Sequence, residues 1–195
     1  MALATFVKIN SVNNLSDARY CAGMEVNQLG FVIDEGQENY VSPTDFNELT
    51  GWLSGVELVG EILTESTNLT AAIADYPLDA IQVMHPSQLT EALATGLKTI
   101  FCSDDLVTAQ SVLQQYPEVD YVLWQNKEEE LTGQLQHSER LVIGAGFTSE
   151  NVKELTKKYK VKGIAMQGGN EIRPGFKNFD ELADILEALD TDEYI

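Results

Sequence analysis

The sequence predicts an α/β protein of one domain, residues 1–195, folded as a compact (β/α)8 TIM barrel with eight parallel strands. Short runs rich in Val, Ile and Leu alternate along the chain with amphipathic segments of helical length, which is the pattern of repeated βα units. Eight such pairs can be counted, and the apolar fraction of 44% is large enough to build a sizeable core. With about 24 residues per unit, the loops of this barrel have to be short.

Each strand is expected at one of the apolar runs, which are residues 6–10, 28–33, 57–62, 80–84, 98–102, 121–124, 141–144 and 163–166. Capping residues precede several of the helical segments, at Ser16-Asp17, Ser42-Pro43, Asp104-Asp105 and Thr148-Ser149. Residues 126–139 are the least regular stretch, so the sixth helix should be short or distorted. An open doubly wound sheet is the alternative, but its first βα turn usually carries a glycine fingerprint, and residues 10–14 here contain no glycine.

The charge of the chain restricts its partners. The formal net charge is −19, with only 12 Lys and Arg residues, so a phosphodiester backbone or an anionic lipid surface would be repelled. We therefore expect no nucleic-acid partner and no membrane partner. A small anionic ligand would have to be held by local backbone N–H groups, which directs attention to glycine-rich turns.

Compartment and cofactor requirements follow from what the sequence lacks. The first ten residues have no basic region followed by a long apolar stretch, and no segment approaches the ~18 apolar residues that span a bilayer, so we expect a cytoplasmic protein. Cys21 and Cys102 cannot form a disulfide framework, and they have no zinc-type spacing with His85 or His137. We expect reduced thiols, no metal and no cofactor.

Two glycine-containing loops predict a phosphate site. In a parallel barrel the loops after the strands form the active face, and the loops after the seventh and eighth strands often hold phosphate. Here these loops contain Gly144, Ala145 and Gly146, and Gln167, Gly168 and Gly169. Glycines also make such turns tight without any ligand, which is the alternative interpretation. We expect a small phosphorylated ligand because both loops occupy the right barrel positions.

The chain resembles the phosphoribosylanthranilate isomerase family in a set of short motifs that run in the family's order over nearly the whole sequence. They are Val7-Lys8-Ile9, Leu29-Gly30-Phe31-Val32, Tyr40-Val41-Ser42-Pro43, Asp79-Ala80-Ile81-Gln82-Val83, Gly144-Ala145-Gly146 with Glu150-Asn151-Val152, and Gly169-Asn170-Glu171 with Pro174-Gly175-Phe176-Lys177. The resemblance implies an isomerase of tryptophan biosynthesis, of the aldose–ketose type, that carries out an Amadori rearrangement of an N-linked 5-phosphoribosyl group.

The resemblance fails at the positions of proton transfer. The family's base is a cysteine in a Lys-Ile-Cys-Gly pattern, where this chain has Asn10 followed by Ser11. The family's acid is an aspartate at the end of the sixth strand, where we assign Trp124, and Gln125 next to it is no acid either. The arginine that usually precedes the Tyr-Val-Ser-Pro motif is replaced by Asn39. Each lost acid or base costs ~10²–10⁴ in rate, so little isomerase activity is expected.

Three residues could replace the lost groups: Glu61, Asp34 and Cys102. Glu61 is a carboxylate late in an apolar strand, Asp34 begins the loop after the second strand, and Cys102 ends the fifth. If Glu61 or Asp34 points into the mouth of the barrel, an enzyme is favoured. If Trp124 plugs the mouth, a binding or a purely structural role is favoured.

Three functions therefore remain open. The first is an isomerase homologue with its activity retained by unusual residues or changed. The second is a non-catalytic phosphate- or phosphosugar-binding barrel, a pseudoenzyme. The third is a barrel that serves protein association. The sequence is compatible with a monomer or a homodimer.

Overall fold

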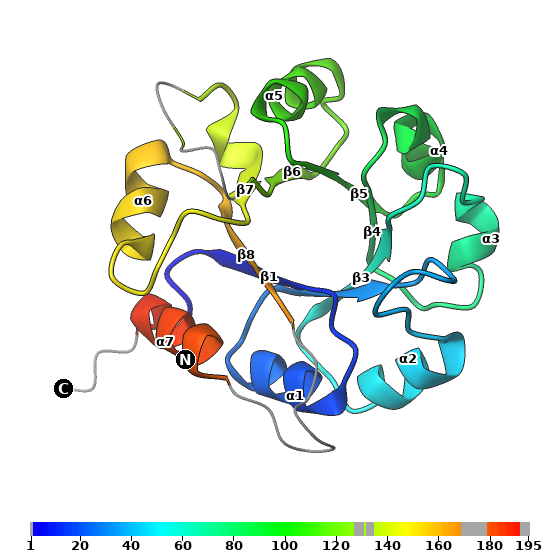
Figure 1. The fold of residues 1–195 in the computed structure, drawn as a ribbon, viewed down its shortest axis with the longest axis horizontal. Coiled ribbons are helices and arrows are strands. Elements are labelled where there is room, and N and C mark those ends of the chain that lie inside the picture. Colours follow the sequence, from blue (N-terminus) through cyan, green and yellow to red (C-terminus); the bar gives the residue numbers. More distant parts are fainter. Residues whose placement is uncertain (1, 127–130, 132–134, 169–178, 192–195) are drawn as a thin grey trace.

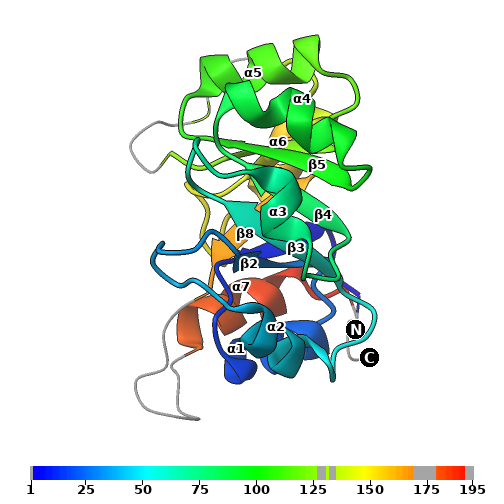
Figure 2. The same ribbon diagram turned by 90° about the vertical axis from the view of Figure 1, so that its right-hand side faces the viewer.

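Eight parallel strands form a closed barrel, as predicted. The structure is a computed structural model that describes residues 2–126, 131, 135–168 and 179–191. The strands pair in chain order from β1 to β8, and β8 pairs with β1 to close the ring. Figure 1 looks along the barrel and shows the helices around the ring of strands, and Figure 2 shows the same layers from the side.

The elements follow the expected alternation. The strands are β1 (Phe6–Asn10), β2 (Gln28–Val32), β3 (Glu57–Ile62), β4 (Ala80–Val83), β5 (Lys98–Ser103), β6 (Tyr121–Trp124), β7 (Leu141–Ile143) and β8 (Gly163–Gln167). The helices are α1 (Leu15–Gly23), α2 (Pro43–Thr50), α3 (Leu69–Ile73), α4 (Leu89–Ala94), α5 (Leu106–Gln115), α6 (Val152–Tyr159) and α7 (Asp180–Leu189), with 3-10 turns η1 (Pro86–Gln88) and η2 (Ser138–Arg140). Each strand ends within one residue of its predicted bound. Between β6 and β7, η2 is the only helical element in the described part of the chain.

The two faces of each strand enter different cores. On β6, Tyr121 and Leu123 pack inside the barrel with Val142 and Ala165 of neighbouring strands. Val122 and Trp124 pack on the other side, in the layer between strands and helices. This alternation follows from the two-residue period of a strand, and it assigns every strand residue to either the barrel interior or the helix-facing layer.

Two of the four predicted helix caps are found. Ser42 caps α2 by accepting from the backbone N–H of Asp45, and Asp105 caps α5 by accepting from two backbone N–H groups. The prediction at Ser16-Asp17 was wrong, because Asn14 caps α1 through its side-chain oxygen. The prediction at Thr148-Ser149 was also wrong, because α6 begins after Asn151 and has no side-chain cap.

Arg140 stabilises the last turn of α5 and the segment that follows it through hydrogen bonds to backbone oxygens. Its guanidinium donates to the backbone oxygens of Leu113 at 3.2 Å, Tyr116 at 3.1 Å and Val119. These carbonyls lie at and beyond the C-terminus of α5, where backbone oxygens lack helical partners and attract positive charge.

Replacing Arg140 with Met is expected to lower the free energy of unfolding by about 1.5–3 kcal/mol, because three carbonyls lose a charged donor. Urea denaturation followed by circular dichroism measures the effect. The control is Arg19→Met, at an exposed arginine of α1. Equal stability losses in the two variants would contradict the assigned role of Arg140.

Candidate functional site

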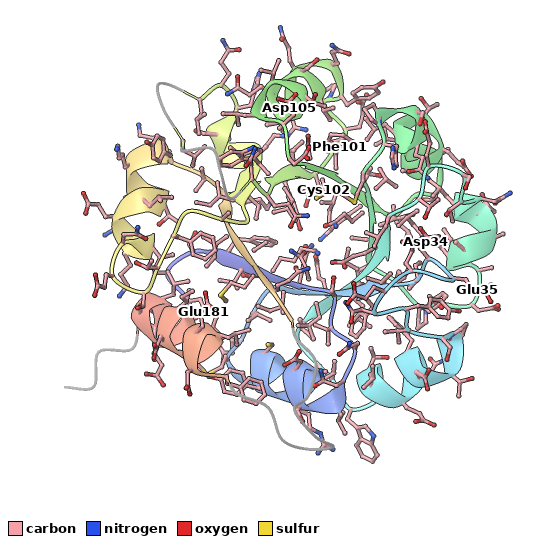
Figure 3. All side chains as sticks on the ribbon, in the orientation of Figure 1. Asp34, Glu35, Phe101, Cys102, Asp105 and Glu181 are labelled. Atoms are coloured by element: carbon pink, nitrogen blue, oxygen red, sulfur yellow. The ribbon has the colours of Figure 1, made fainter. Side chains whose placement is uncertain are left out.

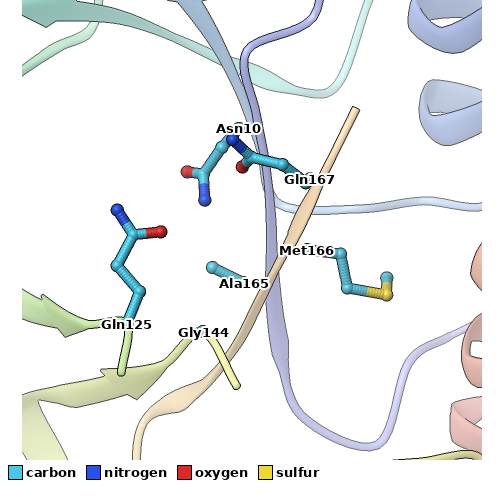
Figure 4. A pocket seen from close by; sticks show the side chains of 6 residues that line it. All are labelled: Asn10, Gln125, Gly144, Ala165, Met166 and Gln167. Atoms are coloured by element: carbon cyan, nitrogen blue, oxygen red, sulfur yellow. The ribbon is translucent and has the colours of Figure 1, made fainter. Parts of the chain in front are cut away.

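A cavity opens at the C-terminal ends of the strands, where the sequence predicts the site. Its volume is about 160 Å³, and its lining residues are Asn10, Gln125, Gly144, Ala165, Met166 and Gln167 (Figure 4). Asn10 ends β1, Gln167 ends β8, and Gln125 and Gly144 directly follow β6 and β7. The structure thus brings Asn10 together with one residue from each of the two predicted phosphate loops.

A buried ion pair between Lys8 and Glu61 holds the side chain of Asn10 in place. Lys8 lies two residues earlier on the same inner face of β1, and its Nζ donates to Asn10 Oδ1 and to Glu61 Oε1, the latter at 2.5 Å. The side chains of Lys8 and Glu61 are 0% and 2% exposed. Gly30 of β2 leaves the space for this pair, since a Cβ there would overlap the Glu61 carboxylate.

The second carboxylate oxygen of Glu61 stabilises the turn after β1 by accepting hydrogen bonds from Ser11. Glu61 Oε2 accepts from the backbone N–H of Ser11 at 3.1 Å and from its hydroxyl at 3.3 Å. Ser11 has φ +53°, a left-handed conformation that costs a residue with a side chain free energy. Glu61 therefore points into the barrel, but both of its oxygens are occupied by Lys8 and Ser11.

Cys102 lies inside the barrel behind Gln125. The Gln125 side-chain nitrogen donates to Cys102 Sγ at 2.8 Å, and the thiol is fully buried. Burial raises the pKa of Cys102 to about 12. At neutral pH the thiol is protonated, so it is not available as a general base.

Asp34 stabilises the loop between β3 and α3. Its carboxylate accepts from the backbone N–H groups of Leu63 at 3.1 Å and Thr64 at 2.7 Å, and from the Thr67 hydroxyl at 2.6 Å. It is 5% exposed and does not line the cavity. In Figure 3 it lies at the rim beside α3, whereas Cys102 lies nearer the centre.

Trp124 does not plug the mouth of the barrel. Its side chain is 1% exposed and packs in the helix-facing layer, and its Nε1 has no hydrogen-bond partner among the described residues. Gln125, one position further along the chain, lines the cavity instead. A shift of one residue reverses the face of a strand, so of the two arrangements considered for the mouth, the one in which Trp124 plugs it is not found.

The two glycine loops use part of their backbone for packing. The N–H of Gly144 donates to Trp124 O and the N–H of Gly168 to Asn10 O, both at 2.7 Å. A Cβ on either glycine would come within 2.9 Å of a neighbouring atom. Close packing therefore explains why glycine occupies these two positions.

Ala145 and Gly146 differ from those glycines. Neither backbone N–H has an acceptor among the described residues, and Gly146 has φ +81°. Successive free N–H groups in such a turn form a concave site that suits an anion. Gly169, the last residue of the predicted phosphate set, lies outside the described residues. Phosphate binding at these loops stays a prediction.

Sequence reasoning missed the interactions behind the cavity. Lys8 lies in an otherwise apolar strand, with Asn10 next on the same face, and this spacing was the available signal for a buried polar cluster. Its partner Glu61 is 53 positions away, so the pairing itself had no local signal.

No group of three or more residues suited to a metal ion is found in the described ranges. Within them, no helix is long and apolar enough to cross a membrane.

Comparison with known proteins gives the following relatives. No family model matches the chain. An N-(5'-phosphoribosyl)anthranilate isomerase from Marinomonas sp. (strain MWYL1) is 23% identical, over 88% of this chain and 91% of the relative. The solved phosphoribosylanthranilate isomerase from Thermotoga maritima superimposes with a TM-score of 0.73 at 23% identity, over 95% of this chain and 98% of that chain.

Other solved barrels extend the comparison. The isomerase from Thermus thermophilus has a TM-score of 0.72 at 20% identity, over 94% of this chain and 98% of that one. A Rubisco-like protein from Rhodopseudomonas palustris has a TM-score of 0.62 at 12% identity, so the structural likeness shows the fold rather than an activity. The Marinomonas relative confirms the resemblance that the ordered motifs predict: over nearly its whole length the chain is similar to phosphoribosylanthranilate isomerases, at 23% identity.

Proposed function

We propose that this protein is a phosphoribosylanthranilate isomerase-like barrel that binds a small phosphorylated ligand and has lost the isomerase activity of tryptophan biosynthesis. The observation that carries the proposal is the lining of the cavity. Asn10 has the position of the family's base, and Gln125 is the cavity-lining residue at the end of β6, so we move the acid position from Trp124 to Gln125. Neither amide can take up or release a proton at neutral pH.

None of the candidate replacements supplies the missing chemistry. Cys102 is protonated because burial raises its pKa to about 12. Glu61 has one oxygen on Lys8 and the other on Ser11. Asp34 accepts three hydrogen bonds from the β3–α3 loop and lies outside the cavity lining. The enzyme hypothesis is therefore weaker than the binding hypothesis.

The free N–H groups of Ala145 and Gly146 support a phosphorylated ligand. They follow Gly144, which lines the cavity, so a bound phosphate would be adjacent to it. A solved phosphoribosylanthranilate isomerase with a TM-score of 0.74 is a complex with reduced 1-(o-carboxyphenylamino)-1-deoxyribulose 5-phosphate. An open cavity also favours a ligand-binding barrel over one that serves protein association alone.

The remaining expectations on partners belong to the same proposal. The net charge of −19 supports a protein that binds neither nucleic acid nor an anionic membrane surface. A cytoplasmic location belongs to the same proposal. The proposed function is compatible with a monomer and with a homodimer.

Two measurements test the proposal: the turnover of phosphoribosylanthranilate and the binding of inorganic phosphate. The purified protein should convert phosphoribosylanthranilate at least ~10⁴-fold more slowly than an active relative assayed alongside, because both an acid and a base are missing. In a ¹⁵N NMR titration with inorganic phosphate, the amide resonances of Ala145 and Gly146 should shift, while chloride at equal ionic strength leaves them in place. Turnover near that of the active relative, or no phosphate-specific shift, would refute the corresponding half of the proposal.

A further inference from the structure

The orientation of the Asn10 amide is set by its buried partner. A lysine ammonium can only donate hydrogen bonds, so the Asn10 atom that contacts Lys8 Nζ has to be the carbonyl oxygen Oδ1. The amide nitrogen Nδ2 is then directed away from Lys8. It has no acceptor among the described residues, and Asn10 lines the cavity. Asn10 thus offers hydrogen-bond donors to a ligand.

The Gln125 amide has the opposite orientation. Its Nε2 donates to Cys102 Sγ at 2.8 Å, and its Oε1 has no donor in the described part of the chain. Figure 4 shows the amide nitrogen of Asn10 and the amide oxygen of Gln125 directed toward each other across the cavity. Gln125 thus offers an acceptor to a ligand.

The part of the cavity between Asn10 and Gln125 has no net charge. The described residues that line it have no ionisable side chain. Lys8 lies just below Asn10, but Glu61 neutralises it at 2.5 Å. An anionic group here would face the lone pairs of Gln125 Oε1 without a compensating cation, and this is unfavourable in a buried site.

We propose that the deep end of the cavity binds an uncharged group in which a carbonyl oxygen lies beside an N–H or O–H donor, with Lys8 and Cys102 as the positioning residues that set this preference. The carbonyl accepts from Asn10 Nδ2, and the neighbouring donor binds Gln125 Oε1. This inference rests on the proposed function, because the phosphate of the same ligand would bind at Ala145 and Gly146.

Three probes of equal charge test the preference. Phosphoglycolamide has a carbonyl beside an N–H donor, dihydroxyacetone phosphate has a carbonyl beside an O–H donor, and the methyl ester of phosphoglycolate has a carbonyl with no donor. Isothermal titration calorimetry should give the ester a Kd about 10-fold weaker than the better of the other two, because Gln125 Oε1 would be left unpaired. The ranking of the first two identifies the donor as N–H or O–H.

Variants of Cys102 test the positioning role. Cys102→Ala removes the partner of Gln125 Nε2 and frees the amide to turn, so the preference over the ester should fall below about 3-fold. Cys102→Ser keeps an acceptor at this place and should keep the preference. The matched control is Cys21→Ala, at the other fully buried cysteine, which lies in α1 and outside the cavity lining.

The outcomes separate the inference from the proposed function. If inorganic phosphate shifts the amides of Ala145 and Gly146 while the three probes bind equally, the ligand class is wrong and the phosphate site stands. The positioning role is overturned if Cys102→Ala keeps the preference or Cys102→Ser loses it. If neither phosphate nor any probe binds, the proposed function fails and this inference fails with it.

Discussion

Glu61→Leu is expected to lower the free energy of unfolding by about 3–5 kcal/mol, because it leaves Lys8 as an uncompensated charge inside the barrel. Lys8 Nζ is 2.5 Å from Glu61 Oε1, and both side chains are almost completely buried. The substitution also removes the acceptor that holds the left-handed Ser11. Guanidinium denaturation of the natural protein and of Glu61→Leu measures this difference in the free energy of unfolding, provided that the two unfolding curves have the same dependence on denaturant concentration.

The double variant Lys8→Met/Glu61→Leu separates charge from packing. Because two apolar side chains replace the whole ion pair, its stability should return to within about 1–2 kcal/mol of the natural protein. The matched control is Lys98→Met, which breaks the exposed pair of Lys98 with Glu57 and should cost less than about 1 kcal/mol. A Glu61→Leu variant as stable as Lys98→Met would show that the buried pair has no special role.

Asn10→Cys combined with Gln125→Asp is expected to raise turnover of phosphoribosylanthranilate by at least ~10²-fold over the natural protein, since it puts a base and an acid into the cavity. The thiol introduced by Asn10→Cys would take the place of the Asn10 amide, whose oxygen now accepts from Lys8 Nζ. The carboxylate introduced by Gln125→Asp would lie at the cavity wall that Gln125 now forms. Initial rates at saturating substrate measure the change.

The control for this experiment is Asn10→Cys with Gln125→Asn, which has the same size but no acid. It should stay at least ~10-fold below the Cys/Asp variant. A second control, Asn10→Cys with Trp124→Asp, should fail to fold stably, because a carboxylate in the helix-facing layer would be unpaired. A folded Cys/Asp variant that binds substrate yet remains as slow as the natural protein would show that the two amides are not what blocks the reaction.

Much of the barrel could be predicted because its signals are local. Segments such as Phe6–Asn10 and Tyr121–Trp124 are recognised from apolar residues that lie close together in the sequence, and the structure has strands with these bounds. The helix caps were less certain, because Ser16 and Asn14 are both good capping residues. Which of them caps α1 depends on where the loop after β1 turns, and that turn is held by Glu61 from another strand.

The sequence by itself determined the eight-stranded parallel barrel, the positions of its strands and the resemblance to the isomerase family, since each depends on the order and spacing of residues along the chain. Only the tertiary structure decided that Gln125 rather than Trp124 faces the cavity, and that Glu61 and Cys102 hold other side chains. The physical reason is that the face of a strand end depends on a single-residue register, and hydrogen-bond partners depend on strands that closure of the barrel brings together.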